Sequence, residues 1–334
     1  MENKMQKKGL TIVILLILVV LGSMTIPGFI SPPPQKTVAI GAATPIINSL
    51  IWVAYAKDFF HEGLDVQFKP YQSGKIALRA LVNNEVDLAT TSEAAFMFNT
   101  FKHEALRLVT TLGSADNEVR IVARRDHGIQ QPSDLKGKTL ATQKGSAVHF
   151  FLSRFLTYNF LKPSDINIIY MKADKLPNAL IQGEIDAFSM REPYLQQAKN
   201  GLGDKAVELA EPGVYTKTHN LVCNKNFVET EQDTLKKVLQ TLNKTAQFME
   251  NHPQESIEII AQKRGMTVPK ISEVWSNYIF ELSLSQSLLT TMEAEARWAI
   301  KHGLLSEENR PNYLDKIYTE ALAEVKPEAV EIIR

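Results

Sequence analysis

Two stretches of the chain carry nearly the same sequence at an offset of 99 residues. Residues 80–93 read ALVNNEVDLATTSE and residues 179–192 read ALIQGEIDAFSMRE, so the alanine, both glutamates and the aspartate match. Each copy is typical of the end of an apolar helix, a Gly or Asn stop, a short strand and a polar turn that opens the next helix. The repeat therefore predicts two similar α/β units, each with a polar strand end.

The segments around the repeat support an α/β fold class. Strand-like and helix-like segments alternate from residue 36 to residue 187, as a mostly parallel sheet requires. A further strand is expected at residues 220–227, followed by helices at 231–251, 253–264, 272–282, 285–302 and 312–323. Because ligands of open α/β sheets bind outside the carboxyl ends of the strands, the two polar strand ends predict a cleft between two lobes.

The bulk composition narrows the class of partner. A chain of 334 residues suits two medium domains or one bilobed unit, and 37 basic residues balance 37 acidic ones. This balance, without a basic tract interleaved with aromatics, argues against nucleic acid and favours a small-molecule partner. The single cysteine, Cys223, excludes an internal disulfide and a cysteine-based metal cluster, and we expect neither a metal nor another cofactor.

The N-terminal residues 1–34 predict export. Lys4, Lys7 and Lys8 precede an uncharged run from residue 9 to residue 21, and weaker apolar residues lead to a Pro-rich linker. The run has no good small-x-small cleavage site and no cysteine for lipidation, so a cleaved signal peptide and a retained anchor both stay open. In either case the rest of the chain is expected in the periplasm or otherwise outside the cytoplasm, with membrane contact only through this segment.

Several short phrases along the chain together resemble one family. They are KDFF at 57–60, EGLDV at 62–66, NEVD at 84–87, PSDLKGK at 132–138, GS at 145–146, GEIDA at 183–187 and EP at 192–193. The set, from about residue 37 to residue 226 with WAIKHGL at 298–304, resembles the solute-binding proteins of ABC importers for nitrate, alkanesulfonates, taurine and thiamine precursors.

The resemblance implies a two-lobed periplasmic-binding-protein fold of type II, the Venus flytrap, with a helical C-terminal region. The first lobe would combine residues 35–124 and 220–334, and the second would hold residues 125–219, with crossings near 123–126 and 215–221. Such a protein captures a small anionic or heterocyclic solute between its lobes and delivers it to the permease of an ABC importer, and we expect a monomer. The closed form is the one that the importer recognises.

Residues at the predicted strand ends are candidates for holding the solute. Gly145 and Ser146 start a helix whose amides and hydroxyl can hold an anion, although Ser146 can equally be a simple N-cap. Hydroxyls of Thr90, Thr91 and Ser92 can bind a polar solute or cap the next helix.

Arg191, directly before Glu192, can fork onto a carboxylate or sulfonate, and its alternative role is a salt bridge. Further candidates, each with a packing or helix-starting alternative, are Thr44, Pro45, His149, His219 and Asn220.

No enzyme signature is recognisable in the chain. Residues 137–139 resemble the end of a phosphate-binding loop, but Pro132 stands where the first glycine belongs. The His-Glu-x-x-His and Gly-x-Ser-x-Gly patterns are missing. We therefore expect a binding protein. The alternatives are a membrane-anchored ligand-sensing module and an enzyme similar to thiamine-pyrimidine synthase, whose cysteine-rich run is not found here.

Overall fold

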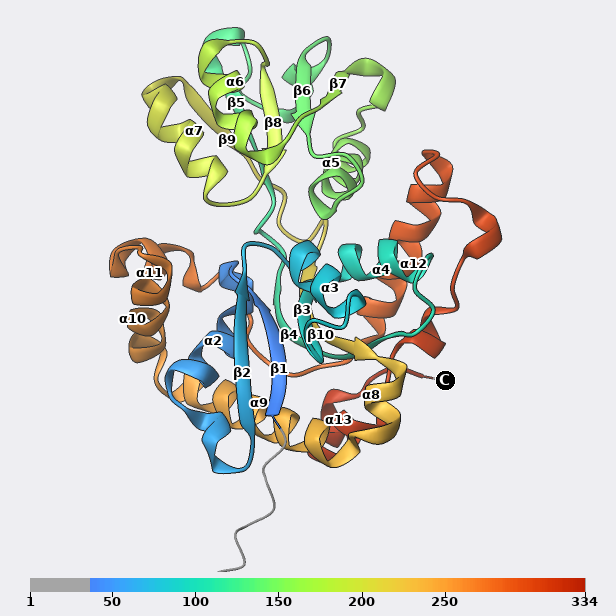
Figure 1. Ribbon diagram of the computed structural model, residues 1–334. Coiled ribbons are helices and arrows are strands. Elements are labelled where there is room, and N and C mark those ends of the chain that lie inside the picture. Colours follow the sequence, from blue (N-terminus) through green and yellow to red (C-terminus); the bar gives the residue numbers. More distant parts are fainter. Residues whose placement is uncertain (1–36, 334) are drawn as a thin grey trace, which may run out of the picture. The chain divides into compact units, whose positions relative to one another are not determined.

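The structure is a computed structural model that describes residues 37–333. The predicted export segment, residues 1–34, lies outside this range. Within it, no helix is both long enough and apolar enough to cross a membrane. The described residues form two five-stranded mixed sheets with helices packed against them, which Figure 1 shows as two separate groups of strands.

The first sheet has the strand order β2-β1-β3-β10-β4. Its strands are β1 (Thr37–Ala43), β2 (Asp65–Tyr71), β3 (Leu88–Ser92), β4 (Leu106–Ala115) and β10 (Lys217–Asn224). Strands β1, β2 and β3 run parallel, whereas β10 is antiparallel to both β3 and β4. The helices between these strands are α2 (Ser49–Ala56), α3 (Gly74–Val82) and α4 (Glu93–Thr100).

The second sheet repeats this plan in the order β7-β6-β8-β5-β9. Its strands are β5 (Arg120–Arg124), β6 (Thr139–Thr142), β7 (Asn167–Tyr170), β8 (Ala187–Met190) and β9 (Ala206–Leu209). Three strands are again parallel, and β5 is antiparallel to both β8 and β9. Its helices are α5 (Ala147–Tyr158), α6 (Leu176–Gln182) and α7 (Tyr194–Leu202).

The two copies of the repeat adopt the same local structure. Helices α3 and α6 stop at residues in the left-handed conformation, Asn84 with φ 58° and Gly183 with φ 79°. This conformation suits glycine and, next best, asparagine. The next amide in each copy donates to the carbonyl of the repeated alanine, Glu85 to Ala80 at 2.9 Å and Glu184 to Ala179 at 3.0 Å. The strands β3 and β8 then begin at equivalent positions.

The crossings between the sheets differ from the boundaries expected from the sequence. The expected boundary after residue 124 would leave β5 in the first lobe, but its pairing with β8 and β9 puts it in the second sheet. The chain therefore crosses at residues 116–119 and returns at 210–216. We propose lobes of 37–115 with 217–333, and of 120–209. The sequence of β5 does not reveal which strands it pairs with. The boundary predicted from the sequence therefore falls on the wrong side of β5.

The C-terminal region is helical, as expected, with two differences. Its helices are α8 (Lys225–Thr230), α9 (Gln232–Asn251), α10 (Pro253–Arg264), α11 (Val268–Trp275), α12 (Gln286–Lys301) and α13 (Glu320–Val325). The helix expected at 272–282 ends at Trp275, because Ile279 and Ser283 instead form bridges to β4. The helix expected at 312–323 is a short 3₁₀ turn, Tyr313–Lys316, followed by α13.

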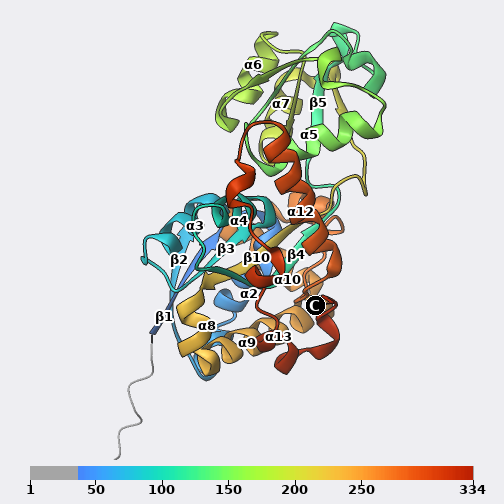
Figure 2. The same cartoon turned by 90° about the vertical axis from the view of Figure 1, so that its right-hand side faces the viewer.

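Helix α12 connects the C-terminal region to both lobes. It packs against α4 of the first lobe (Figure 2). The Trp298 ring of α12 also contacts His149 and Phe150 of α5, with ring centroids 4.8 and 5.5 Å apart. Cys223, in β10, is fully buried, and burial raises the pKa of its thiol. It therefore packs as a small apolar side chain.

Candidate functional site

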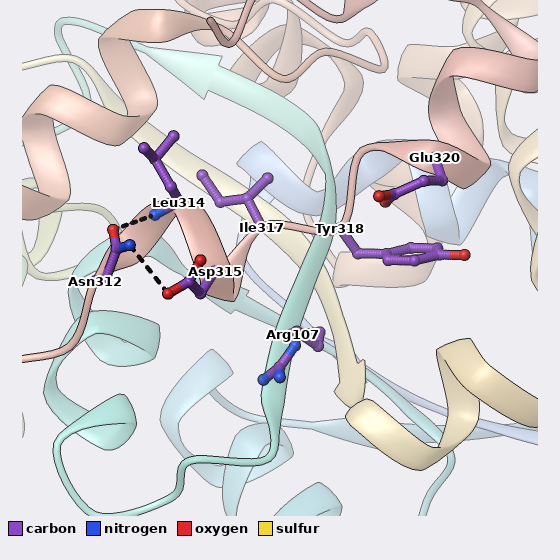
Figure 3. A pocket seen from close by; sticks show the side chains of 7 residues that line it. All are labelled: Arg107, Asn312, Leu314, Asp315, Ile317, Tyr318 and Glu320. Carbon is purple, nitrogen blue, oxygen red and sulfur yellow. Dashed lines mark hydrogen bonds between the residues drawn. The ribbon is translucent and has the colours of Figure 1, made fainter. Parts of the chain in front are cut away.

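One groove of about 380 Å³ lies on the first lobe, between the start of β4 and the segment that leads into α13 (Figure 3). It is lined by Arg107, Asn312, Leu314, Asp315, Ile317, Tyr318 and Glu320. The Arg107 guanidinium already donates to the carbonyl oxygens of Glu104 and Leu106, both at 2.9 Å. No residue predicted from the sequence to bind a solute lines this groove, so the groove is a weak candidate for the site.

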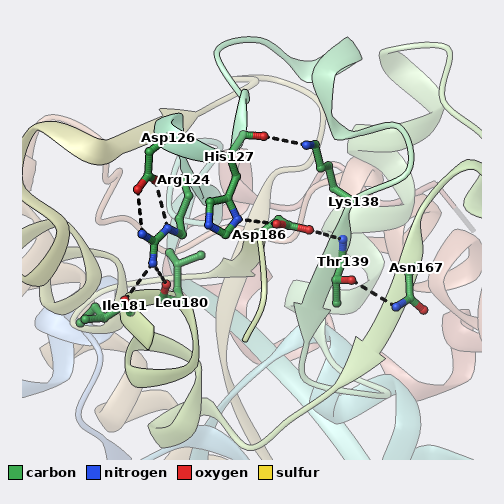
Figure 4. A network of polar contacts seen from close by, with 9 residues as sticks. All are labelled: Arg124, Asp126, His127, Lys138, Thr139, Asn167, Leu180, Ile181 and Asp186. Atoms are coloured by element: carbon green, nitrogen blue, oxygen red, sulfur yellow. Dashed lines mark hydrogen bonds and ion pairs between the residues drawn. The ribbon is translucent and has the colours of Figure 1, made fainter. Parts of the chain in front are cut away.

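The repeated aspartates lie at the amino ends of the sheets and hold strands together. The Asp186 amide donates to the Thr139 carbonyl at 2.9 Å, and its Oδ2 accepts from the Thr139 amide at 2.7 Å (Figure 4). Its Oδ1 contacts Nδ1 of His127 at 2.6 Å. Asp87 forms the same two bonds with Ala39, at 2.9 and 2.8 Å. This half of the repeat is structural.

At the carboxyl end of β3, three residues from distant segments come together. A Cβ atom at Gly74, the first residue of α3, would lie 2.7 Å from Cα of Thr91 and 3.2 Å from Cε1 of His219. Glycine is therefore required at position 74 for this close approach. The Thr91 hydroxyl and both ring nitrogens of His219 are buried and have no hydrogen-bond partner in the described part of the chain.

The His219 ring is neutral in this environment. Burial lowers its pKa well below the ordinary value, and the positive charges of Lys217 and Arg191 act in the same direction. A neutral imidazole has one nitrogen that donates and one that accepts. Buried polar groups are nearly always paired, so the unpaired groups on both Thr91 and His219 make this strand end a candidate site for a polar molecule.

Arg191 follows β8 and is partly buried. No hydrogen bond or ion pair joins its guanidinium to another residue in the range 37–333, and its charge acts on both His219 and Tyr278. The salt bridge to Glu192 considered from the sequence is not formed. Glu192 instead pairs with Arg120 at 3.3 Å and accepts from the Gln196 amide at 3.0 Å. Arg191 is therefore a cation without a compensating partner near the hinge.

A cavity of about 290 Å³ adjoins this region, with walls from both lobes and from the α10–α11 hairpin. It is lined by Pro45, Ile46, Glu118, Arg120, Glu192, Pro193, Gln196, Gln197, Lys199, Asn200, Arg264, Met266, Lys270, Glu273, Val274 and Tyr278. Of the residues predicted from the sequence, Pro45 and Glu192 are in this wall. The cavity is large enough for a small organic molecule at the hinge.

Two of the predicted residues have every polar side-chain atom hydrogen-bonded within the protein. The Thr90 hydroxyl accepts from the Ala43 amide at 2.8 Å and from Nδ2 of Asn48 at 2.9 Å. Asn220 accepts from Thr111 and donates to Thr218, both at 2.9 Å. These two residues hold β1, β3, β4 and β10 together, which is the structural alternative for each.

His149 is also engaged, within the contact between α5 and α12. Its Nδ1 accepts from the Gly145 amide at 3.3 Å, and its Nε2 lies 3.5 Å from the Tyr170 hydroxyl. The ring packs edge-on against Trp298. Burial lowers the pKa of His149 to about 4. The ring is therefore neutral at pH 7, and the geometry favours the packing role over ligand binding.

The remaining predicted residues lie at or just after strand ends. The hydroxyls of Thr44, Ser92 and Ser146 each have one hydrogen-bond partner. Thr44 and Ser146 donate to main-chain carbonyl oxygens at 3.2 and 2.6 Å. Ser92 accepts from a main-chain amide of α4 at 3.3 Å and so acts as its N-cap. Gly145 has φ 61° and faces Phe98 of α4 across the lobes. Binding roles for these residues stay predictions.

Sequence reasoning missed the residues that the C-terminal helices bring to the cavity. Arg264 ends α10, and Tyr278 follows α11. Both lie in a region where no local pattern suggests chemistry, and no local signal could have identified them. Among residues 37–333, no group of three or more His, Cys, Asp and Glu side chains is placed to hold a metal ion.

Comparisons with known proteins fit this geometry. The model of a family described as NMT1/THI5-like matches residues 48–256, which is more than half of the chain. A protein of Bacillus subtilis strain 168 described as an aliphatic sulfonates-binding protein is 24% identical over 277 residues, covering 81% of this chain and 82% of that protein.

Solved structures show the same fold. The periplasmic aliphatic sulphonate binding protein SsuA of Escherichia coli superimposes with a TM-score of 0.74 at 19% identity, covering 85% of this chain and 92% of the other. The periplasmic nitrate-binding protein NrtA of Synechocystis PCC 6803 superimposes with a TM-score of 0.65 at 12% identity, covering 88% and 89%. The fold is that of the periplasmic binding proteins, as the sequence resemblance implied.

Proposed function

The chain belongs to the NMT1/THI5-like family, and from this premise we propose that it is an extracytoplasmic solute-binding protein of an ABC importer. Its task is to hold a small anionic solute between two lobes and present it to a permease. Support comes from the sulfonate-binding relatives and from the two-lobed fold. The protein binds its solute and does not transform it. The expected export segment supports a location outside the cytoplasm.

The observation that carries the proposal is the set of unpaired polar groups at the strand ends. Thr91 and His219 offer a hydroxyl and a neutral imidazole from the first lobe, and Arg191 offers an unpaired guanidinium from the second. A solute that touches both sides makes more contacts in the closed state than in the open one. That differential contact supplies the free energy for closure.

The experiment that tests the proposal is a binding screen of the purified full chain. Alkanesulfonates, taurine, nitrate and pyrimidine precursors are added singly, and the shift in the melting temperature is measured. A ligand at about 100 times its Kd adds about 2.7 kcal/mol of stability. The proposal fails if no member of the screen stabilises the protein and none binds in calorimetry.

The variant Arg191→Met then tests the role of the guanidinium. Charge-assisted hydrogen bonds contribute about 1.5–3 kcal/mol, so the variant should bind an anionic solute about tenfold more weakly or worse. Its melting temperature without solute should stay the same or rise, because a partly buried unpaired charge is removed. Arg125→Met, at an exposed arginine of the second lobe, is the control. A variant that melts earlier but binds normally would show that Arg191 is structural.

A further inference from the structure

The charges around Tyr278 do not balance. On one side of the cavity, Glu118 forms a buried ion pair with Lys217, which links the first crossing to the start of β10. On the other side, Arg120 pairs with Glu192 and Glu208.

Lys199 also pairs with Glu208, at 2.9 Å. The charges of these four side chains, Arg120, Lys199, Glu192 and Glu208, therefore sum to zero. In the described part of the chain, the cations near Tyr278 that have no carboxylate partner are Arg191 and Arg264. The other charged residues in the wall, Lys270 and Glu273, are exposed.

The Arg264 side chain is partly exposed, and one of its three guanidinium nitrogens is buried. Its Nε is buried and has no hydrogen-bond partner within residues 37–333, although the side chain lines the cavity. Burial lowers the pKa of Arg264 from its ordinary value. A partly desolvated guanidinium with an unpaired Nε is unfavourable unless an anion reaches it. The position therefore suits an anionic ligand.

Tyr278 and Arg264 line the same cavity, and Arg191 directly precedes Glu192, another residue of its wall. The charge of Arg191 acts on Tyr278, and Tyr278 in turn acts on Arg264. Burial raises the pKa of Tyr278 well above its ordinary value, with a further contribution from Glu118, so the phenol keeps its proton. A protonated phenol can donate a hydrogen bond to an oxyanion.

We propose that Arg264 and Tyr278 complete an anion clamp at the hinge, in which Arg191 approaches from the second lobe. The inference rests on the proposed function and adds residues from the C-terminal helices to the site. Arg264 and Tyr278 belong to the same lobe as β1 and β3, whereas Arg191 follows β8 of the other lobe. An oxyanion held between them therefore bridges the lobes. The clamp makes the charged group of the solute the part that drives closure.

The test compares the full chain with Arg264→Gln and with the control Lys263→Gln. The control removes the same charge from the neighbouring exposed position of α10. Melting temperatures are measured in sodium chloride and in sodium sulfate at equal ionic strength, so that inorganic sulfate is the probe. Wild type and the control should gain stability specifically from sulfate, and Arg264→Gln should lose most of that gain. Without sulfate, Arg264→Gln should melt at the same temperature as wild type or higher.

Two further variants separate the clamp from a structural role. Arg264→Lys keeps the positive charge but cannot donate two parallel hydrogen bonds, so it should retain only part of the stabilisation by sulfate. Tyr278→Phe keeps the aromatic ring but removes the hydroxyl, so it should also lose part of the stabilisation by sulfate. The inference is overturned if sulfate shifts wild type, Arg264→Gln and the control equally, or if Arg264→Gln melts earlier than the control without sulfate and keeps the full sulfate effect.

The same variants distinguish this inference from the proposed function. If an organic anion binds wild type, binds Arg191→Met about tenfold more weakly and binds Arg264→Gln as tightly as wild type, the solute-binding function stands and the clamp is overturned. If sulfate stabilises the protein through Arg264 but no solute in the screen binds, the clamp stands and the proposed function fails.

Discussion

The two copies of the repeat are alike in their first half and different in their second half. Both copies end a helix at a left-handed residue, and both place an aspartate that bonds twice to the start of the neighbouring parallel strand. Where the strand ends, the first copy reads Thr91-Ser92-Glu93 and the second reads Met190-Arg191-Glu192. The half that builds the sheet is duplicated, and the half at the carboxyl end of the strand has diverged.

The repeated glutamate shows how far this divergence goes. Glu93 is fully buried, accepts from the Thr218 amide at 2.8 Å and bonds to the Tyr215 hydroxyl. Glu192, its counterpart, is partly exposed and pairs with Arg120. The first copy uses its glutamate to tie the return crossing to α4. In the second copy, Glu192 pairs with Arg120 of β5 in the second lobe. Arg191 beside it has no ion-pair partner among residues 37–333.

The buried glutamate of the first copy leads to the prediction with the largest expected effect. The Tyr215 hydroxyl lies within hydrogen-bonding distance of both Glu93 and Glu295, which is 3.2 Å away. One phenol proton cannot serve two ionised carboxylates, so one carboxyl keeps its own proton. Burial raises the pKa of Glu295 well above its ordinary value, and the charge of Glu93 adds to this. We therefore expect Glu295 to be protonated in the folded protein.

The sign of the pH dependence follows from this raised pKa. Below about pH 4.5, the folded and unfolded chains both bind the proton, and this source of stability is fully present. As the pH rises through the folded pKa of Glu295, that stability is lost, at up to about 1.4 kcal/mol per pH unit. Glu295→Gln should make the free energy of unfolding depend less on pH, as measured by urea unfolding between pH 5 and 8.

The control for this prediction is Glu293→Gln, at a partly exposed position of the same helix. Parallel curves for wild type and Glu295→Gln across this pH range would contradict the protonated state.

The repeated aspartates give the next largest effect. Asp186→Ala leaves the Thr139 amide without a partner, and Asp87→Ala does the same to the Ala39 amide. Each loss should cost roughly 2–3 kcal/mol of unfolding free energy, measured in urea. Glu184→Ala, at an exposed position of the same turn, should change little. If one aspartate matters and the other does not, the two first halves are not equivalent.

The smallest effect is expected at Ser92, which occupies the same place in the first copy as Arg191 does in the second. Its hydroxyl caps α4 by accepting from the Ala95 amide at 3.3 Å. Ser92→Ala should therefore cost about 1 kcal/mol of stability and leave the affinity for an anion nearly unchanged. The opposite pattern, lower affinity at full stability, would show that the first copy also contacts the solute at this position.

Local signals explain why much of the fold could be predicted from the sequence. Helices α9, α10 and α12 lie within one residue of their expected bounds, and the stops at Asn84 and Gly183 are where the repeat predicted them. Apolar periodicity and left-handed stops act over a few residues, so they are readable without the rest of the chain. The segment after Trp275 was misread because its extended shape depends on pairing with β4.

What the sequence by itself determined is the duplicated α/β plan and the strand ends at which a ligand could bind. Only the tertiary structure decided which polar groups there already have partners, because those partners come from segments far away in the chain. Within residues 37–333, Thr90 and Asn220 are hydrogen-bonded across the first sheet, whereas Thr91 and His219 are buried without hydrogen-bond partners. Arg264 reaches the same hinge from a helix whose sequence carries no sign of it, because burial and proximity are properties of the folded chain.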